Sequence, residues 1–179
     1  MENSCRPGYL SVKIGAFMDK ADFEHWVLET QKPLVRFCCQ MVEDWAEAED
    51  MAQEAYIRAW EKRAGFKGES SLLTWQMAIA RRVCLDRLRS LKRTRTVPLD
   101  ERESTPAPDI ETKADVQRAL AKLKAKDRAI LYLRAEQELP FEEVSRVLGH
   151  TPAACRKRYE RARKKLAQAL ERKDGHNGE

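Results

Sequence analysis

The sequence has few helix-breaking residues and lacks the long apolar runs that mark membrane proteins. Only seven glycines and seven prolines occur in 179 residues, which favours helices over β-hairpins. No apolar run approaches the roughly 20 residues needed to span a bilayer. The first residues also lack the basic start and long apolar stretch of a secretory signal. We therefore expect a cytoplasmic protein that does not enter a membrane.

The five cysteines and three histidines lack the spacing of zinc ligands. No CxxC pair occurs, and His25, His150 and His176 are isolated from one another. An odd number of cysteines suits free thiols in a reducing compartment, so we expect most of them to fill small apolar gaps. The adjacent pair Cys38 and Cys39 is the best candidate for a thiol or metal sensor.

Charge is divided unevenly along the chain. Residues 19–54 contain ten acidic and three basic residues, whereas residues 81–95 contain seven basic and one acidic, and residues 152–173 nine basic and two acidic. Basic zones commonly meet phosphate, and acidic zones meet basic protein surfaces. The pattern predicts two separate basic surfaces and one acidic surface.

Residues 19–93 are expected to form one helical unit. Apolar residues recur every three or four positions from Phe23 to Met41, which predicts a helix with one buried stripe that Pro33 kinks or breaks. Helical patterns return in "WAEAEDMAQEAYIRAWEKR" and, after the break "AGFKGESS", in "SSLLTWQMAIARRVCLDRLRSLKR". Ten of the thirteen aromatic residues lie at or before Trp75, so the larger core is expected here.

Residues 94–112 are predicted to be a linker, because three prolines stand there among charged and small polar residues. A structureless stretch of this length is unusual inside one compact domain. We therefore predict an all-α fold of two small helical domains joined by a flexible linker. Residues 1–18 are assigned to an N-terminal extension and 174–179 to a polar tail.

Residues 113–173 are expected to form the second helical unit. Pro140 suits the first turn of a helix that Gly149 ends. Thr151 can cap the following helix, with Pro152 at its first position. A helix, a tight glycine turn and a second helix make a helix-turn-helix pattern.

The helix after this turn carries many basic residues. Its inward or near-inward side is expected to include Ala154, Cys155, Tyr159, Ala162 and Leu166. A recognition helix places its early residues on base edges and its flanking basic residues on phosphates. A solvated basic face is the alternative, which the preceding turn pattern disfavours. Alone, the pattern fits any bacterial regulator.

Two stretches resemble the extracytoplasmic-function (ECF) group of bacterial sigma factors. "AEDMAQEAYIRAW", followed by "FKGESSLLTWQMAIARRVCLDRLR", resembles the N-terminal domain of that family, σ2. "ALAKLKAKDRAILYLRAEQELPFEEVSRVLGHTPAACRKRYERARKKL" resembles its C-terminal domain, σ4. The stretches stand in the family's order and cover most of the chain.

The resemblance implies that the first unit binds the clamp helices of the largest subunit of core RNA polymerase. Carboxylates on its acidic helix can form ion pairs with a basic coiled coil, and Met51 and Ile57 supply apolar surface for the same contact. Trp60 is expected in the core rather than at the contact. The implied polymerase-binding residues are Glu49, Asp50, Gln53, Glu54 and Ile57.

The resemblance also implies capture of the melted −10 promoter strand. This task requires a pocket for an extruded base and a basic track for the strand. The implied residues are Phe66, Lys67, Gly68, Ser70, Ser71, Arg81, Arg82, Arg87 and Arg89. The family often has Asn where this chain has Arg82, so base preference there is expected to differ. Leu72, Trp75 and Ile79 are expected to be core.

The second unit is implied to read the −35 element as duplex. The implied contact residues are Thr151, Arg156, Lys157, Arg158, Arg161 and Lys165. Ala154 and Cys155 replace the Thr and Val that are common in the family. Cys155 is expected to be a core filler, because a redox role requires exposure and a lowered pKa.

The resemblance thus implies a transcription initiation factor that is not an enzyme and uses no metal or cofactor. Its implied partners are core RNA polymerase and promoter DNA, and the sequence is compatible with an anti-sigma protein as a further partner. A stand-alone helix-turn-helix regulator of duplex operator DNA is the main alternative. A regulatory module that binds polymerase without initiating, and, more remotely, a DNA-processing enzyme also stay open.

Overall fold

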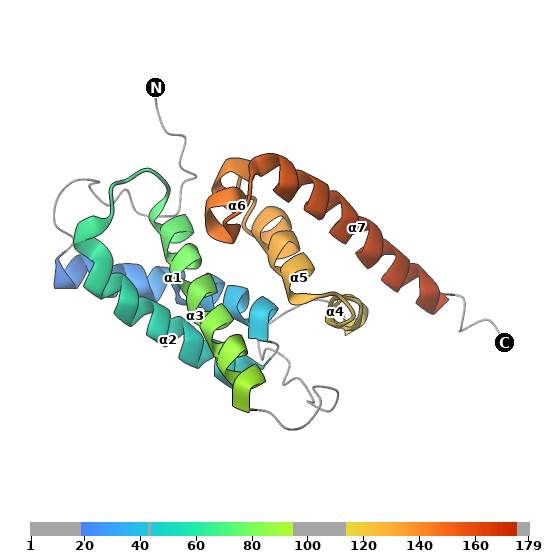
Figure 1. The fold of residues 1–179 in the computed structure, drawn as a ribbon, viewed down its shortest axis with the longest axis horizontal. Coiled ribbons are helices and arrows are strands. Elements are labelled where there is room, and N and C mark those ends of the chain that lie inside the picture. Colours follow the sequence, from blue (N-terminus) through green and yellow to red (C-terminus); the bar gives the residue numbers. More distant parts are fainter. Residues whose placement is uncertain (1–18, 43, 95–113, 175–179) are drawn as a thin grey trace.

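The computed structural model describes residues 19–42, 44–94 and 114–174, and these are helical with short connections (Figure 1). In chain order the elements are α1 (Lys20–Val42), α2 (Trp45–Lys62), the 3-10 turn η1 (Arg63–Gly65), α3 (Leu72–Thr94), α4 (Ala114–Ala121), α5 (Ala125–Leu131), the π-helical turn η2 (Tyr132–Glu136), α6 (Phe141–Leu148) and α7 (Pro152–Asp174). No strand occurs in these ranges, which confirms the all-α prediction. The predicted extension, nearly all of the linker and the tail lie outside the described residues.

The first unit consists of α1, α2 and α3 packed against one another. Helix α1 continues through Pro33, so of the two expected effects, a kink or a break, the break does not occur. Proline removes one N–H from the helix, and the fully buried Leu34 and Phe37 that follow it favour continuing the same stripe. Asp44 begins α2, and its carboxylate accepts a hydrogen bond of 2.8 Å from the backbone N–H of Glu47.

An aromatic cluster closes one end of this unit. The ring of Phe23 lies 5.6 Å from that of Trp26 and 5.0 Å from that of Trp60, and Trp26 meets Tyr56 edge-on at 5.7 Å. The Tyr56 and Thr30 hydroxyls are 2.8 Å apart. Burial raises the pKa of Tyr56, so it stays protonated. Trp60 is half-buried and packs against Phe23 at the edge of this cluster, so it is not the core residue that was expected.

The second unit contains α4 to α7, with the helix-turn-helix formed by α6 and α7. Gly149 ends α6 in the left-handed region, with φ 65°. The Thr151 hydroxyl accepts a 3.2 Å hydrogen bond from the N–H of Ala154, and α7 begins at Pro152. Both predictions are confirmed, whereas Pro140 precedes α6 rather than lying within its first turn.

The inward side of α7 is largely as predicted. Cys155 and Ala162 are buried, and Tyr159 and Leu166 are half-buried. Ala154 is exposed, so its assignment to the inward side is wrong. It directly precedes Cys155 on the helix, and the 100° step between neighbours turns it away from the core.

The two units are packed together, with α5 against α1 and α6 against α3 (Figure 1). Their buried apolar residues form one cluster that includes Phe37 of α1 and Ile130 of α5. The hydroxyl of Tyr132 donates a 2.7 Å hydrogen bond to the carbonyl of Pro33 in α1. Nε of Arg128 donates one of 3.1 Å to the carbonyl of Gln40. The sequence predicted the units but not this interface.

One buried amide in the first unit has no hydrogen-bond partner. Gln76 on α3 is fully buried, and neither its Oε1 nor its Nε2 is hydrogen-bonded to any described residue. An unsatisfied buried polar group destabilises the fold by about 1–3 kcal/mol. We predict that Gln76→Leu raises the free energy of unfolding by about 1–2 kcal/mol, measured by urea denaturation.

The control for this prediction is Gln31→Leu, an exposed glutamine on α1. It should change the free energy of unfolding by no more than about 0.5 kcal/mol. A loss of stability in Gln76→Leu would mean that the amide is hydrogen-bonded in solution.

Candidate protein and nucleic-acid interfaces

An acidic surface with one apolar residue covers the outer side of α2. Glu49, Asp50, Gln53 and Ile57 are exposed, and Glu54 is half-buried and pairs with Arg58 at 2.7 Å. Spacings of three and four residues place Asp50, Gln53 and Ile57 on one face. Ile57 is 56% exposed, which is unusual for a large apolar side chain in this fold. We call these five predicted residues, 49, 50, 53, 54 and 57, the α2 acidic face.

The loop before α3 presents an aromatic pair. The ring of Phe66 lies 5.2 Å from that of Trp75, and both side chains are half-buried. Gly68 has φ 71°, which a side chain would strain. The Ser71 hydroxyl accepts a 3.1 Å hydrogen bond from the N–H of Thr74 and so caps α3. The loop is thus a defined turn that carries a partly open aromatic surface.

Other loop residues lie at its edge. Lys67 is exposed, and the Ser70 hydroxyl donates to the carbonyl of Ser71 at 3.2 Å. The carbonyl of Glu69 accepts a hydrogen bond from Arg146 of α6. Of the predicted core residues, Ile79 is buried, whereas Leu72 and Trp75 are half-buried. The loop is therefore in direct contact with the second unit.

The four predicted arginines of α3 have different surroundings. Arg82 is exposed, whereas Arg81 is half-buried and lies at the interface between the units. Arg87 pairs with Glu47 at 2.7 Å, and Arg89 pairs with Asp86 at 3.0 Å. The sequence predicted their charge correctly but could not show that acidic neighbours compensate two of them.

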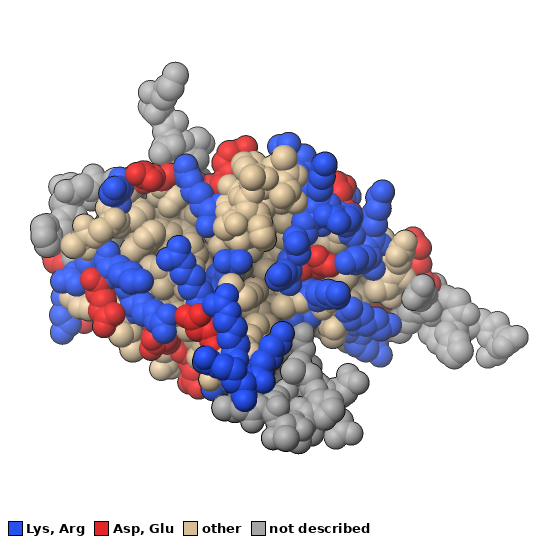
Figure 2. Space-filling view, in the orientation of Figure 1, with Lys and Arg blue, Asp and Glu red and all other residues tan. Residues whose placement is uncertain are grey.

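The basic residues of α7 form a broad exposed surface, visible as blue side chains along this helix in Figure 2. Arg156, Lys157 and Arg161 are exposed, and Lys157 and Arg161 are one helical turn apart. The guanidinium of Arg156 lies 5.0 Å from the centre of the Phe141 ring, which holds it near the start of α7. We call these three residues the α7 basic face. Thr151 lies beside it as the helix cap.

Two other predicted contact residues of α7 share a carboxylate. Asp127 in the first turn of α5 lies 2.6 Å from Lys165 and 3.7 Å from Arg158. The Asp127 side chain is only 8% exposed, while those of Lys165 and Arg158 are 52% and 31% exposed. Sequence reasoning missed Asp127, because it lies more than thirty residues away in the chain.

The thiols are poorly suited to sensing. Cys155 is 1% exposed, and burial raises its pKa. Cys38 is fully buried, and its contact with Cys84 together with burial raises its pKa well above the ordinary value. A protonated, inaccessible thiol reacts slowly. These two cysteines therefore fill space, as expected, and the burial of Cys38 makes the Cys38–Cys39 pair poorly suited to a sensor.

The described residues also contain no group of three or more His, Cys, Asp or Glu side chains placed to hold a metal ion. None of the helices in residues 19–42, 44–94 and 114–174 has both the length and the apolar character that a bilayer crossing requires.

Two family models match the chain in order. The model described as Sigma-70 region 2 matches residues 26–94, and that described as Sigma-70, region 4 matches residues 113–166. The first match begins at Trp26 within α1 and runs to the end of α3, and the second covers α4 to α6 and α7 as far as Leu166. The two helical units therefore coincide with two separately matched regions.

Named relatives agree with these matches. The chain is 32% identical to the ECF RNA polymerase sigma factor SigM of Mycobacterium tuberculosis (strain Erdman), over 76% of this chain and 69% of that protein. It is 29% identical to SigX of Bacillus subtilis, over 77% and 78%. It is also 29% identical to SigG of M. tuberculosis, over 82% of this chain but only 48% of that protein. The chain thus spans about half the length of SigG.

Two solved structures share the fold. The sigma factor RpoE of Bartonella quintana, in complex with the anti-sigma factor NepR, matches with a TM-score of 0.72 and 24% identity, over 84% of this chain and 97% of that chain. CnrH, in complex with the cytosolic domain of CnrY, matches with a TM-score of 0.63 and 21% identity, over 86% and 90%.

The shared carboxylate leads to a prediction about α7. Asp127→Asn should release Arg158 and Lys165 for contact with phosphate, so the affinity for duplex DNA of arbitrary sequence should rise at low salt. Each added phosphate contact steepens the dependence of log affinity on log salt by about 0.9. We expect a slope steeper by about 1–2, measured by fluorescence anisotropy across a salt series.

The matched control is Asp115→Asn, which removes the same charge from the first turn of α4, where Asp115 pairs with the exposed Arg118. Its salt slope should stay close to that of the unmodified protein. Equal slopes in the two variants would show that Asp127 acts only through net charge.

Proposed function

The chain belongs to the extracytoplasmic-function group of the sigma-70 family, and from this premise we propose that it is a transcription initiation factor. It binds core RNA polymerase and directs the enzyme to promoters. It contributes binding free energy and leaves covalent chemistry to the polymerase. The observation that carries the proposal is that the α2 acidic face and the α7 basic face are exposed on separate matched regions of one chain.

The α2 acidic face is proposed to hold the polymerase. Its carboxylates complement a basic helical surface, which increases the rate and the specificity of association. Ile57 provides apolar area that is 56% exposed in the free chain and becomes buried on contact. Helix α2 is rigidly packed through Ala52, Ala55 and Ala59, so the face is presented in one orientation.

The α7 basic face is proposed to read the −35 element. Gly149 and the Thr151 cap fix the angle at which α7 leaves α6. The N-terminal turns of α7 then carry Arg156, Lys157 and Arg161 outward, where guanidinium groups can bond guanine edges or phosphates. Thr151 and the more distant Lys165 would contact the phosphate backbone.

The loop before α3 is proposed to receive the melted −10 strand. Phe66 and Trp75 offer an aromatic surface on which an unpaired base can stack, and the exposed Arg82 can meet a phosphate beside it. Arg81 and the carbonyl of Glu69 face the second unit in this arrangement. The units must therefore separate before the strand reaches the whole surface.

This packed arrangement also suits control by a protein inhibitor. One structural neighbour, RpoE, is a sigma factor in complex with the anti-sigma factor NepR. We extend that class of partner to this chain as part of the proposal.

The polymerase contact is tested by charge reversal on α2. The double change Glu49→Lys and Asp50→Lys should weaken binding to core polymerase by about tenfold or more, because attraction to a basic surface becomes repulsion. Affinity would be measured by fluorescence anisotropy of the labelled protein. The matched control reverses two acidic residues on α1, Glu24→Lys and Glu29→Lys, and should bind nearly normally. Equal losses in both pairs would count against the α2 acidic face.

The function as a whole is tested by transcription from a supercoiled promoter template with purified core polymerase. The protein should support initiation only together with core enzyme. The double change Lys157→Ala and Arg161→Ala should reduce −35-dependent initiation by about tenfold or more, because each base contact contributes about 1–3 kcal/mol. It should leave polymerase affinity unchanged. Tight binding to a duplex operator without polymerase, and no initiation with it, would favour a stand-alone regulator.

A further inference from the structure

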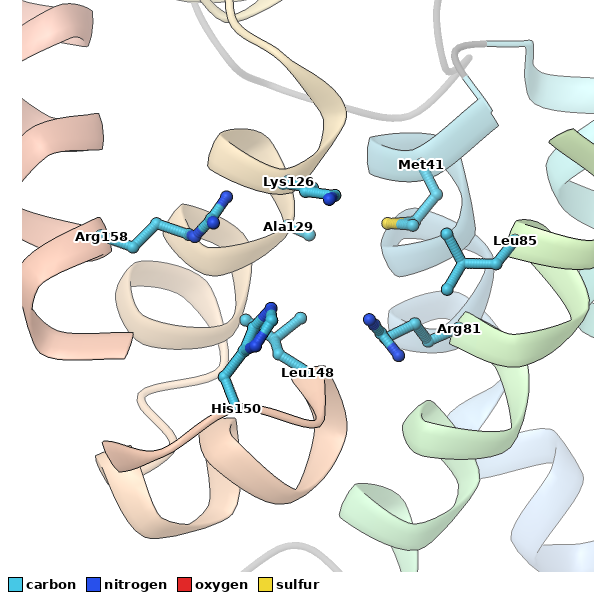
Figure 3. A pocket seen from close by; sticks show the side chains of 8 residues that line it. All are labelled: Met41, Arg81, Leu85, Lys126, Ala129, Leu148, His150 and Arg158. Atoms are coloured by element: carbon cyan, nitrogen blue, oxygen red, sulfur yellow. The ribbon is translucent and has the colours of Figure 1, made fainter. Parts of the chain in front are cut away.

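A small cavity lies between the two units, beside the turn of the helix-turn-helix (Figure 3). Its apolar lining comes from Met41 and Leu85 of the first unit and from Ala129 and Leu148 of the second. Its inner space of about 20 Å³ takes one water-sized group. A group bound here would touch both units at once.

Four nitrogen-bearing side chains surround this cavity. They come from four elements, namely α3, α5, the turn and α7, and are Arg81, Lys126, His150 and Arg158. Figure 3 shows the Arg81 guanidinium directed across the cavity toward the side from which Lys126 and Arg158 approach. A Cβ built on Gly149 would lie 3.8 Å from Nη1 of Arg81, so Arg81 reaches the turn itself.

This group of cations has little negative charge to balance it. No acidic side chain is among the described residues that line the cavity. Within the described part of the chain, Arg81 and Lys126 have no ion-pair partner. Arg158 lies 3.7 Å from Asp127, but that carboxylate is engaged more closely by Lys165 at 2.6 Å. The positive charge at the cavity is therefore largely uncompensated.

The surroundings oppose further protonation here. Loss of hydration lowers the pKa of His150, and the charges of Arg158, Arg81 and Lys126 lower it further. Loss of hydration, followed by the charges of Arg82 and Arg89, also lowers the pKa of Arg81. Arg81 and Arg158 are half-buried, whereas Lys126 and His150 are exposed. Like charges held close together raise the energy of the packed arrangement, most of all where they are half-buried. A bound anion would remove that repulsion.

We propose that this cavity is a binding site for a terminal phosphoryl group, as carried by inorganic phosphate, pyrophosphate or the end of a nucleoside polyphosphate. Such a group has three unesterified oxygens and nearly two negative charges at neutral pH. One oxygen fits the inner space, and the others lie at the mouth beside Arg81, Lys126 and Arg158. Arginine suits this role because its planar fork bonds two oxygens at once.

A phosphodiester of a DNA backbone fits less well. It has one negative charge and two esterified oxygens, so the flanking nucleosides would have to enter the interface. The inner space of about 20 Å³ does not admit them. A bound terminal phosphoryl group would bridge Arg81 of the first unit and the cations of the second, and would stabilise the packed arrangement. This site requires neither polymerase nor promoter DNA and goes beyond the proposed function.

The test is isothermal titration calorimetry with pyrophosphate on the full chain, at an ionic strength held constant with sodium chloride. We expect one site per chain. Arg81→Gln should weaken binding at least tenfold. Arg82→Gln removes the same charge from the next residue of α3, which is exposed and does not line the cavity, and should weaken it less than twofold. Absence of binding, or equal weakening in the two variants, would overturn the site.

A second pair of variants tests the site independently, in case Arg81→Gln does not fold. Lys126→Gln should weaken binding several-fold, whereas Lys124→Gln, an exposed lysine at the start of α5 that does not line the cavity, should not. In NMR spectra pyrophosphate should shift the His150 ring resonances and raise the pKa of His150, because a nearby anion favours the imidazolium. An unmoved His150 would place the anion elsewhere.

The source of the phosphate is tested by competition. A single-stranded oligonucleotide with 5′- and 3′-hydroxyl ends contains only backbone phosphodiesters. At the same phosphate concentration it should leave pyrophosphate bound. Displacement would overturn the preference for a terminal phosphoryl group. Because these measurements contain no polymerase or promoter, their failure would leave the proposed function standing.

Discussion

The contact between the two helical units decides which of the described charged residues are exposed to solvent and which lie at the interface. It depends on apolar packing and on two side chains of the second unit that donate to carbonyls of α1, Tyr132 to Pro33 and Arg128 to Gln40. Arg128 is 4% exposed and also donates to the carbonyl of Leu123 at 2.5 Å. A buried guanidinium is tolerated only when its donors are satisfied, so its partners fix how the second unit sits on the first.

This contact divides the charged residues into two groups. The α2 acidic face and the α7 basic face remain outside and are available to large partners. Arg81 and the backbone of the loop at Glu69 are turned toward the other unit. The interface therefore leaves two of the proposed binding surfaces exposed while it restricts the third, the loop before α3. Binding free energy from a partner that prefers the separated units would be needed to expose all three surfaces together.

Much of the local structure, such as the helix-turn-helix, could be predicted from the sequence. Glycine at 149 and the Thr151–Pro152 pair have strong conformational preferences of their own, so the helix-turn-helix was predicted almost residue by residue. Ile57 was expected at a contact surface because of the family resemblance rather than because of helical spacing, and it is exposed. Pro33 does not break α1, because its local preference is outweighed by the buried residues that follow it.

Long-range contacts could not be predicted in this way. The pairing of Asp127 with Arg158 and Lys165, the pairing of Glu47 with Arg87, and the position of Arg81 at the interface depend on how the helices pack. Helical spacing shows only which residues share a face.

The core that the two units share has a thermodynamic consequence of its own. Parting the units would hydrate apolar side chains such as Leu148 and Met41, and would therefore raise the heat capacity of the protein even though every helix stayed intact.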